Sequence, residues 1–130
     1  MKITFTPAAQ QRLERYLSPN KKMILDYEDG VGPFSAVGNC SLDDGFRLIF
    51  VSKDLDLPDF NKKIDSNLGD IYIKGYTAVQ FADQMEVRFN PKYFTMPLVT
   101  PMGILTDNIE VVDFSDQGIP EQVTGQAHDC

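Results

Sequence analysis

MKITFTPAAQQRLERYL, residues 1–17, is the stretch that decides how this chain begins to fold. Residues 1–5 alternate apolar and polar side chains, as a strand with one buried face does. Thr6 is a favoured N-cap residue, and Pro7 suits the first helical position, where a missing N–H leaves no hydrogen bond unmade. An apolar stripe follows at helical spacing, made of Ala9, Leu13, Tyr16 and Leu17. The stretch therefore predicts a strand followed directly by an amphipathic helix, which Ser18-Pro19-Asn20 ends.

Beyond this helix the apolar period changes to two, which predicts strands. β-branched and aromatic residues fill six segments of this kind, at 23–27, 46–51, 71–76, 85–89, 93–99 and 108–114. Residues 55–69 have no regular pattern, and either one helical turn or a packed surface loop fits them. One helix followed by many short strands indicates an α+β protein that is mainly β. We expect one N-terminal helix packed on a compact antiparallel β structure, arranged as one sheet or as two small ones.

The length and charge of the chain limit its domain organisation and its partners. Its 130 residues suffice for one domain, which we expect over residues 1–114, followed by a polar, mobile tail over 115–130. A net charge of −7 repels phosphate backbones and argues against nucleic-acid binding. No apolar run approaches the ~18 residues of a membrane span, and residues 1–5 do not look like a signal peptide. We therefore expect a cytoplasmic protein without a membrane or nucleic-acid partner.

Soft metal donors are few in this sequence. Apart from methionine sulphur, the candidates are Cys40, Cys130 and His128. One chain therefore offers two thiolates, whereas an iron–sulphur cluster usually takes about four. A symmetric homodimer could pool the thiols of two chains; the alternative is that Cys40 is a small buried residue and Cys130 an exposed terminal thiol. These residues by themselves assign neither a metal site nor a cofactor.

Other polar clusters admit a catalytic or binding interpretation, and each also fits a turn or a solvated loop. Glu28-Asp29 and Asp43-Asp44 could act as a paired acid and base, although such runs are more often solvated. Residues 65–70 alternate oxygen ligands in the manner of a calcium loop but lack its closing glutamate. Residues 30–35 begin like a dinucleotide-binding loop but lack its third glycine. We therefore predict turns at 65–70 and 30–35, and no catalytic residue.

Two parts of the chain together resemble a known family. The first runs from Met1-Lys2-Ile3-Thr4-Phe5-Thr6-Pro7-Ala8-Ala9 through the helix to a strand ending in Asp26-Tyr27. The second comprises YFTMPL, residues 93–98, and ILTDNIEVVD, residues 104–113. Both are similar to HesB/IscA-type, or A-type, iron–sulphur cluster biosynthesis proteins, and more closely to the small bacterial branch whose first loop carries Gly-Cys-Gly-Cys. The resemblance covers about residues 1–114 and implies a HesB-like domain.

The chemistry of that family rests on cysteine thiolates, and this chain departs from the family there. Gly30-Val31-Gly32-Pro33 stands where the resemblance places Gly-Cys-Gly-Cys, so that Val31 and Pro33 take the cysteine positions. A shift of one residue would put Gly32 and Phe34 there instead. Neither alternative supplies sulphur, and no Cys-Gly-Cys follows near the C-terminus.

The resemblance therefore implies a non-catalytic relative whose cluster ligation is lost or reduced. Such a protein would act by binding small ligands or other proteins, with iron–sulphur assembly proteins as the expected partners. Two alternatives stay open. One is a metal or iron–sulphur carrier that uses Cys40 and Cys130 across a homodimer, and the other is a small enzyme that uses the loop carboxylates.

Overall fold

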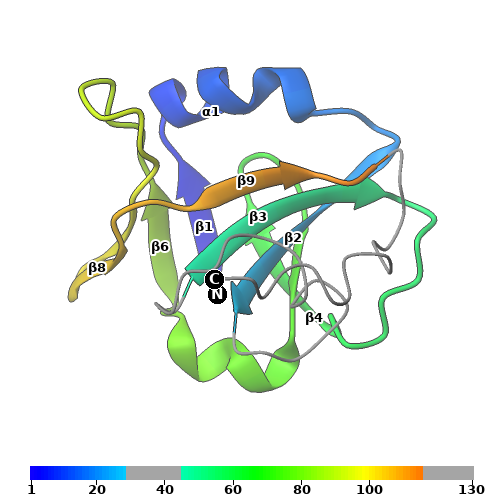
Figure 1. Ribbon diagram of the computed structural model, residues 1–130. Helices are drawn as coiled ribbons and strands as arrows, with labels where there is room; N and C mark the ends of the chain where they lie inside the picture. The colour runs from blue at the N-terminus through cyan, green and yellow to red at the C-terminus, as the bar shows by residue number, and fades with distance from the viewer. Residues whose placement is uncertain (29–44, 116–130) are drawn as a thin grey trace, which may run out of the picture.

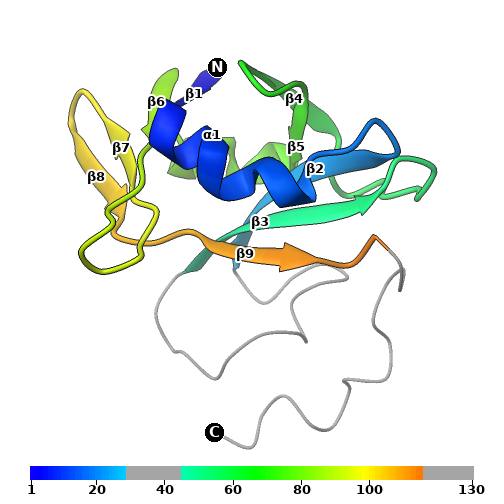
Figure 2. The same cartoon turned by 90° about the horizontal axis from the view of Figure 1, so that it is seen from above.

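The computed structural model describes residues 1–28 and 45–115. Within them, nine strands form one curled sheet in the order β8-β7-β6-β1-β4-β5-β2-β3-β9, and the helix α1 lies across one end of it (Figures 1 and 2). The elements in chain order are β1 (Lys2–Phe5), α1 (Pro7–Leu13), the 3-10 helix η1 (Glu14–Tyr16), β2 (Lys21–Glu28), β3 (Gly45–Ser52), β4 (Lys62–Ser66), β5 (Ile71–Ile73), the 3-10 helix η2 (Gly75–Gln80), β6 (Gln84–Val87), β7 (Leu98–Thr100), β8 (Gly103–Thr106) and β9 (Glu110–Asp113). The predicted fold class, α+β and mainly β, is confirmed. None of the helices in these residues is both long and apolar enough to cross a membrane.

The N-terminal strand and helix form for the reasons that their residues suggest. Thr6 Oγ1 accepts a hydrogen bond from the Ala9 N–H at 3.3 Å, and proline occupies the start of the helix. The helix buries Ala9 and Leu13 against the main core. After Leu13 the chain tightens into η1, and Leu17 leaves it in an extended conformation. The predicted strand and helix are therefore confirmed, with the last turn of the helix in 3-10 form.

The sheet is mixed, and the expectation of antiparallel pairing is wrong for part of it. β2 and β3 pair antiparallel along their whole length, from Lys21 opposite Ser52 to Glu28 opposite Gly45. In contrast, β1 is parallel to both of its neighbours, β4 and β6. The pairs β2–β5 and β3–β9 are parallel as well. Parallel neighbours need long crossover connections instead of hairpins. The apolar pattern identifies a strand but not the direction of its partner, so these pairings could not be predicted from it.

Two elements of the central region differ from their prediction. The stretch 55–69 contains a strand, β4, in which Ile64 is the buried residue and most of the others face solvent. One buried side chain in five residues leaves no alternation to detect. The strand predicted over 71–76 ends at Ile73, and η2 follows. The predicted turn near 65–70 is confirmed, because Gly69 has a φ of 122° and its N–H donates to the Ser66 carbonyl.

The strand predicted over 93–99 is a loop followed by the short strands β7 and β8. Asn90 and Thr95 form an isolated antiparallel bridge, so the residues between them reverse the chain direction. β7 begins only after Pro97, which cannot donate a ladder hydrogen bond. β7 pairs with β6 on one side and with β8 on the other, and β8 is an edge of the sheet.

The two faces of β2 and its neighbours carry two separate cores. Met23 and Leu25 point into the main core, which α1 helps to cover, whereas Ile24 belongs to a second, smaller core. The buried members of the smaller core are Ile24, Ile49, Val51, Leu57, Phe60 and Phe114. Because the side chains of a strand alternate between faces, Asp26 lies on the same face as Ile24. A charged residue is thus directed at the second core.

A salt bridge joins the first residue of β2 to the last residue of β9. Lys21 Nζ lies 2.9 Å from Asp113 Oδ2, and the Ser115 N–H donates to Asp113 Oδ1 at 2.9 Å. Burial raises the pKa of Asp113, but the hydrogen bonds from Ser115 and Lys21 outweigh it and hold the pKa below its ordinary value of 3.8. A carboxylate with a lowered folded-state pKa stabilises the fold above its unfolded-state pKa. That contribution is lost as the pH falls through the folded-state pKa.

We expect Asp113→Asn to lower the free energy of unfolding by about 0.5 kcal/mol at neutral pH. The difference should disappear in strongly acidic buffer, because Asp113 of the unchanged protein is then protonated and is uncharged, like asparagine. Urea unfolding of both proteins at the two pH values measures this. Lys21→Met should reproduce the neutral-pH loss. A difference that stays the same at both pH values would show that Asp113 does not act through its charge.

Candidate functional site

Of the predicted site residues, only Glu28 falls within the part of the chain that the structure describes. Asp29, the segment Gly30-Val31-Gly32-Pro33, Cys40, and the pair Asp43-Asp44 fall outside the described residues, as do His128 and Cys130. Glu28 is the last residue of β2, and only its backbone is described. The structure therefore brings none of these candidates together, and it describes instead the strand ends that frame the first loop.

Three charged side chains at these strand ends are buried together. Lys74 Nζ lies 3.1 Å from Asp26 Oδ1, and Arg47 Nη2 lies 3.6 Å from Asp26 Oδ2. Their side chains are 0%, 6% and 1% exposed for Lys74, Arg47 and Asp26. Charges removed from water this completely need partners, because desolvation of each ion costs several kcal/mol. We call these three residues the charged row.

Strand register explains why the charged row assembles. Asp26 on β2 is directly opposite Arg47 on β3. The parallel register of β2 with β5 pairs Ile24 with Tyr72, so that two residues further on Lys74 stands beside Asp26. On the other side, Arg47 pairs with Glu110 of β9. The side chains therefore alternate in sign from Lys74, directly after β5, through Asp26 on β2 and Arg47 on β3 to Glu110 on β9.

An apolar row lies immediately next to the charged one. It is formed by the residues two positions away on each strand, namely Tyr72, Ile24, Ile49 and Val112. These belong to the smaller core or pack against it. The charged row thus sits between an apolar core and the ends of β2 and β3, in surroundings where electrostatic interactions are stronger than in water.

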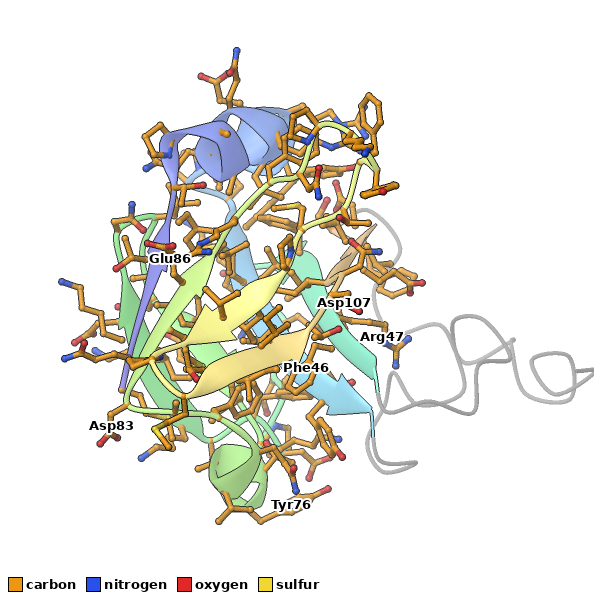
Figure 3. The ribbon with its side chains drawn as sticks, turned by 90° about the vertical axis from the view of Figure 1, so that its left-hand side faces the viewer. Phe46, Arg47, Tyr76, Asp83, Glu86 and Asp107 are labelled. Carbon is orange, nitrogen blue, oxygen red and sulfur yellow. The ribbon has the colours of Figure 1, made fainter. Side chains whose placement is uncertain are left out.

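Lys74 also begins the 3-10 helix η2. Its carbonyl oxygen accepts hydrogen bonds from the Thr77 N–H at 2.9 Å and from Thr77 Oγ1 at 2.6 Å. Its Nζ lies 5.9 Å from the centre of the Tyr76 ring. Tyr76 is 59% exposed and points away from the sheet, as Figure 3 shows. Lys74 therefore contacts both the buried Asp26 and the exposed ring of Tyr76.

The opposite face of the same strand ends is aromatic. Tyr27 and Phe46 are neighbours across β2 and β3, with ring centres 5.2 Å apart. Phe81 meets Phe46 edge to face at 5.5 Å. The end of β2 and the start of β3 therefore have ion pairs on one face and tilted or edge-to-face ring contacts on the other.

The chemistry of these strand ends is structural. Asp26 is enclosed by two cations and is nearly inaccessible, so it cannot reach the proton of a substrate, as a general base must. Within residues 1–28 and 45–115, no three histidine, cysteine or carboxylate side chains come close enough to bind a metal ion. The charged row is suited to holding the ends of the first loop at a defined spacing.

Sequence reasoning missed all three members of the charged row. Each lies within a segment predicted as a strand: 23–27, 46–51 or 71–76. A signal was available, because each is a lone charge among apolar residues. Such a residue is rarely fully buried without a partner. The partners themselves depended on strand pairings that the sequence pattern does not reveal, antiparallel for Asp26 with Arg47 and parallel for Asp26 with Lys74.

Comparisons with known proteins agree on one family. The model of a family described as iron-sulphur cluster biosynthesis matches residues 1–113. A crystal structure from Lactobacillus salivarius, of a candidate Fe–S biosynthesis protein with a fold reported as novel, is 39% identical with a TM-score of 0.82. The alignment covers 89% of this chain and 100% of that one. A candidate Fe–S biosynthesis protein from Lactobacillus acidophilus shares the fold at 24% identity and a TM-score of 0.69, over 87% of this chain and 90% of that one. A search of curated proteins gave no match.

Proposed function

This chain belongs to the iron–sulphur cluster biosynthesis family, and on that basis we propose that it serves the process as a non-catalytic protein whose cluster ligation is lost or reduced. It acts by binding another protein or a small ligand. Its partners are the proteins that assemble iron–sulphur clusters, and it carries no resident cofactor. It works in the cytoplasm, where reducing conditions keep both of its cysteines as thiols.

One observation carries this proposal. The span that matches the family model contains a single cysteine, Cys40. The positions where the resemblance places the cysteines of Gly-Cys-Gly-Cys hold Val31 and Pro33 or, with a shift of one residue, Gly32 and Phe34. A hydrocarbon side chain offers iron no anionic donor, and clusters are usually held by about four thiolates. Even a homodimer that used every Cys40 would supply only half of them. The charged row supports the proposal, because it maintains the spacing of the loop ends without taking part in ligation.

Anaerobic reconstitution with ferrous iron and sulphide tests the proposal. After desalting, we expect iron and sulphide well below one cluster per dimer, and no visible absorption band of the kind that clusters give. Cys40→Ser and Cys130→Ser should behave like the unchanged chain. A stoichiometric brown chromophore that disappears in Cys40→Ser would overturn the proposal in favour of a carrier that uses Cys40 and Cys130.

A further inference from the structure

A groove on the outer side of α1 combines arginine and aromatic side chains. It has a volume of about 610 Å³ and runs between α1 and the segment that follows β6. Figures 1 and 2 both show that segment beside the helix. Its lining includes Gln11, Arg12, Arg15, Phe89, Pro91 and Phe94. We call it the helix groove, and it lies away from the strand ends that frame the first loop.

The aromatic wall of the helix groove is built at an energetic cost. Phe94 has a φ of 55°, a left-handed conformation that a bulky side chain rarely adopts, and its side chain is 69% exposed. Its loop is nevertheless ordered by hydrogen bonds in both directions between Asn90 and Thr95. Strain of this kind tends to occur at functional sites. Here it holds an exposed ring edge to face against Phe89, at 5.8 Å.

The cationic wall comes from one face of the helix and its extension. The Arg12 guanidinium lies 5.8 Å from the centre of the Phe89 ring and 5.9 Å from that of Phe94. Arg15 lies over Tyr16 at 4.8 Å. None of the ion pairs recorded among the described residues involves Arg12 or Arg15. The ring contacts therefore orient both guanidinium groups. Arg15 Nη2 also donates to the Tyr16 hydroxyl at 2.7 Å, and its remaining N–H donors, with those of Arg12, can bind a carboxylate.

The charge of the helix groove indicates what kind of partner it binds. The whole chain carries a net charge of −7, yet the helix groove presents two arginines against one carboxylate, that of Glu14. Arginine beside exposed aromatic rings is the composition of energetically dominant binding sites in protein interfaces. From these observations we infer that the helix groove docks an acidic peptide segment of a partner protein, with an apolar side chain against Phe94 and carboxylates on Arg12 and Arg15. This inference goes beyond the proposed function and holds whether or not the chain binds a cluster.

Titration of the full chain with fluorescent peptides tests the inference. The probes are a short peptide rich in glutamate that carries leucine and phenylalanine, the same peptide with glutamine for glutamate, and the same peptide with lysine for glutamate. We expect the acidic peptide to bind best and to weaken as salt is added, because salt screens the charges. Arg12→Gln and Phe94→Gly should each weaken binding about tenfold. Lys53→Gln, in the turn after β3, is the matched control and should change nothing.

Phe94→Gly separates binding from folding. Glycine adopts a positive φ without strain, so this variant should unfold at the same or a higher urea concentration even as it loses the peptide. Equal affinity for the acidic and lysine peptides, or unchanged binding in Arg12→Gln, would overturn the inference. Stronger binding of a single-stranded oligonucleotide would overturn it in favour of nucleic acid. A dimer of the protein alone that Phe94→Gly dissociates would overturn it in favour of a second copy of the chain.

Discussion

Replacing Lys74 with methionine should lower the free energy of unfolding by about 3–5 kcal/mol, which is the usual cost of removing one partner from a buried ion pair. The Lys74 side chain is 0% exposed, and Asp26, 3.1 Å away, is 1% exposed. Methionine fills a similar volume but removes the cation nearest to the Asp26 carboxylate, which stays buried. Since small domains are stable by only about 5–15 kcal/mol, a large share of the total would be lost.

Urea unfolding followed by circular dichroism measures this loss, and Lys63→Met is its matched control. Lys63 lies on the neighbouring strand β4 and pairs with Asp70 at 3.9 Å, with both side chains more than half exposed. The same substitution there should change stability by no more than about 0.5 kcal/mol. Equal losses in the two variants would mean that the burial of Lys74 has no energetic consequence.

Replacing all three members of the charged row should restore much of the stability. Buried ion clusters can often be exchanged for apolar residues of similar volume at little cost, because the charges that compensated one another are removed together. We therefore expect the triple variant Asp26→Leu, Arg47→Met, Lys74→Met to be more stable than Lys74→Met alone. The comparison distinguishes an unpaired charge from lost packing, since only the first is repaired by removing more charges.

The charged row also shows where sequence reasoning about this fold reaches its limit. The helix start at Thr6 and Pro7 depends on local chemistry, and it is predicted correctly. β2 and β3 are predicted correctly because their apolar residues are dense. β4 is missed because its burial rests on Ile64 alone. Whether a strand or helix can be predicted from the sequence therefore depends on how many of its own residues are apolar and buried.

Long-range pairing leaves no such local trace. Asp26, Arg47 and Lys74 are each visible in the sequence as a charge within an apolar strand, but their contact results from an antiparallel register on one side of β2 and a parallel register on the other. The helix groove likewise joins α1 to a loop more than seventy residues further along the chain. Both features depend on contacts between distant segments, so neither could be predicted from a local sequence pattern. Residues 30–33 were singled out as functional only because of the family resemblance.

On the proposed loss of ligation, the double substitution Val31→Cys, Pro33→Cys should enable this protein to hold a cluster. It restores Gly-Cys-Gly-Cys at residues 30–33, so that two copies of the chain together supply about four thiolates. After anaerobic reconstitution we expect visible absorption, retained iron and sulphide at about one cluster per two chains, and a dimer on size-exclusion chromatography. The expected change is from no retained cluster to nearly full loading.

Two matched variants make this prediction decisive. Gly32→Cys with Phe34→Cys tests the alternative alignment, which is shifted by one residue, and the pair that loads more iron identifies the true cysteine positions. Val79→Cys with Met102→Cys adds the same number of thiols at side chains that are 84% and 95% exposed, and it measures adventitious binding. If neither loop variant retains more iron than this surface variant, the proposal that replaced cysteines account for a loss of ligation is wrong. In that case the residues between β2 and β3 are not the place where a cluster would be bound. The reason for any loss of ligation would then lie in another part of the chain.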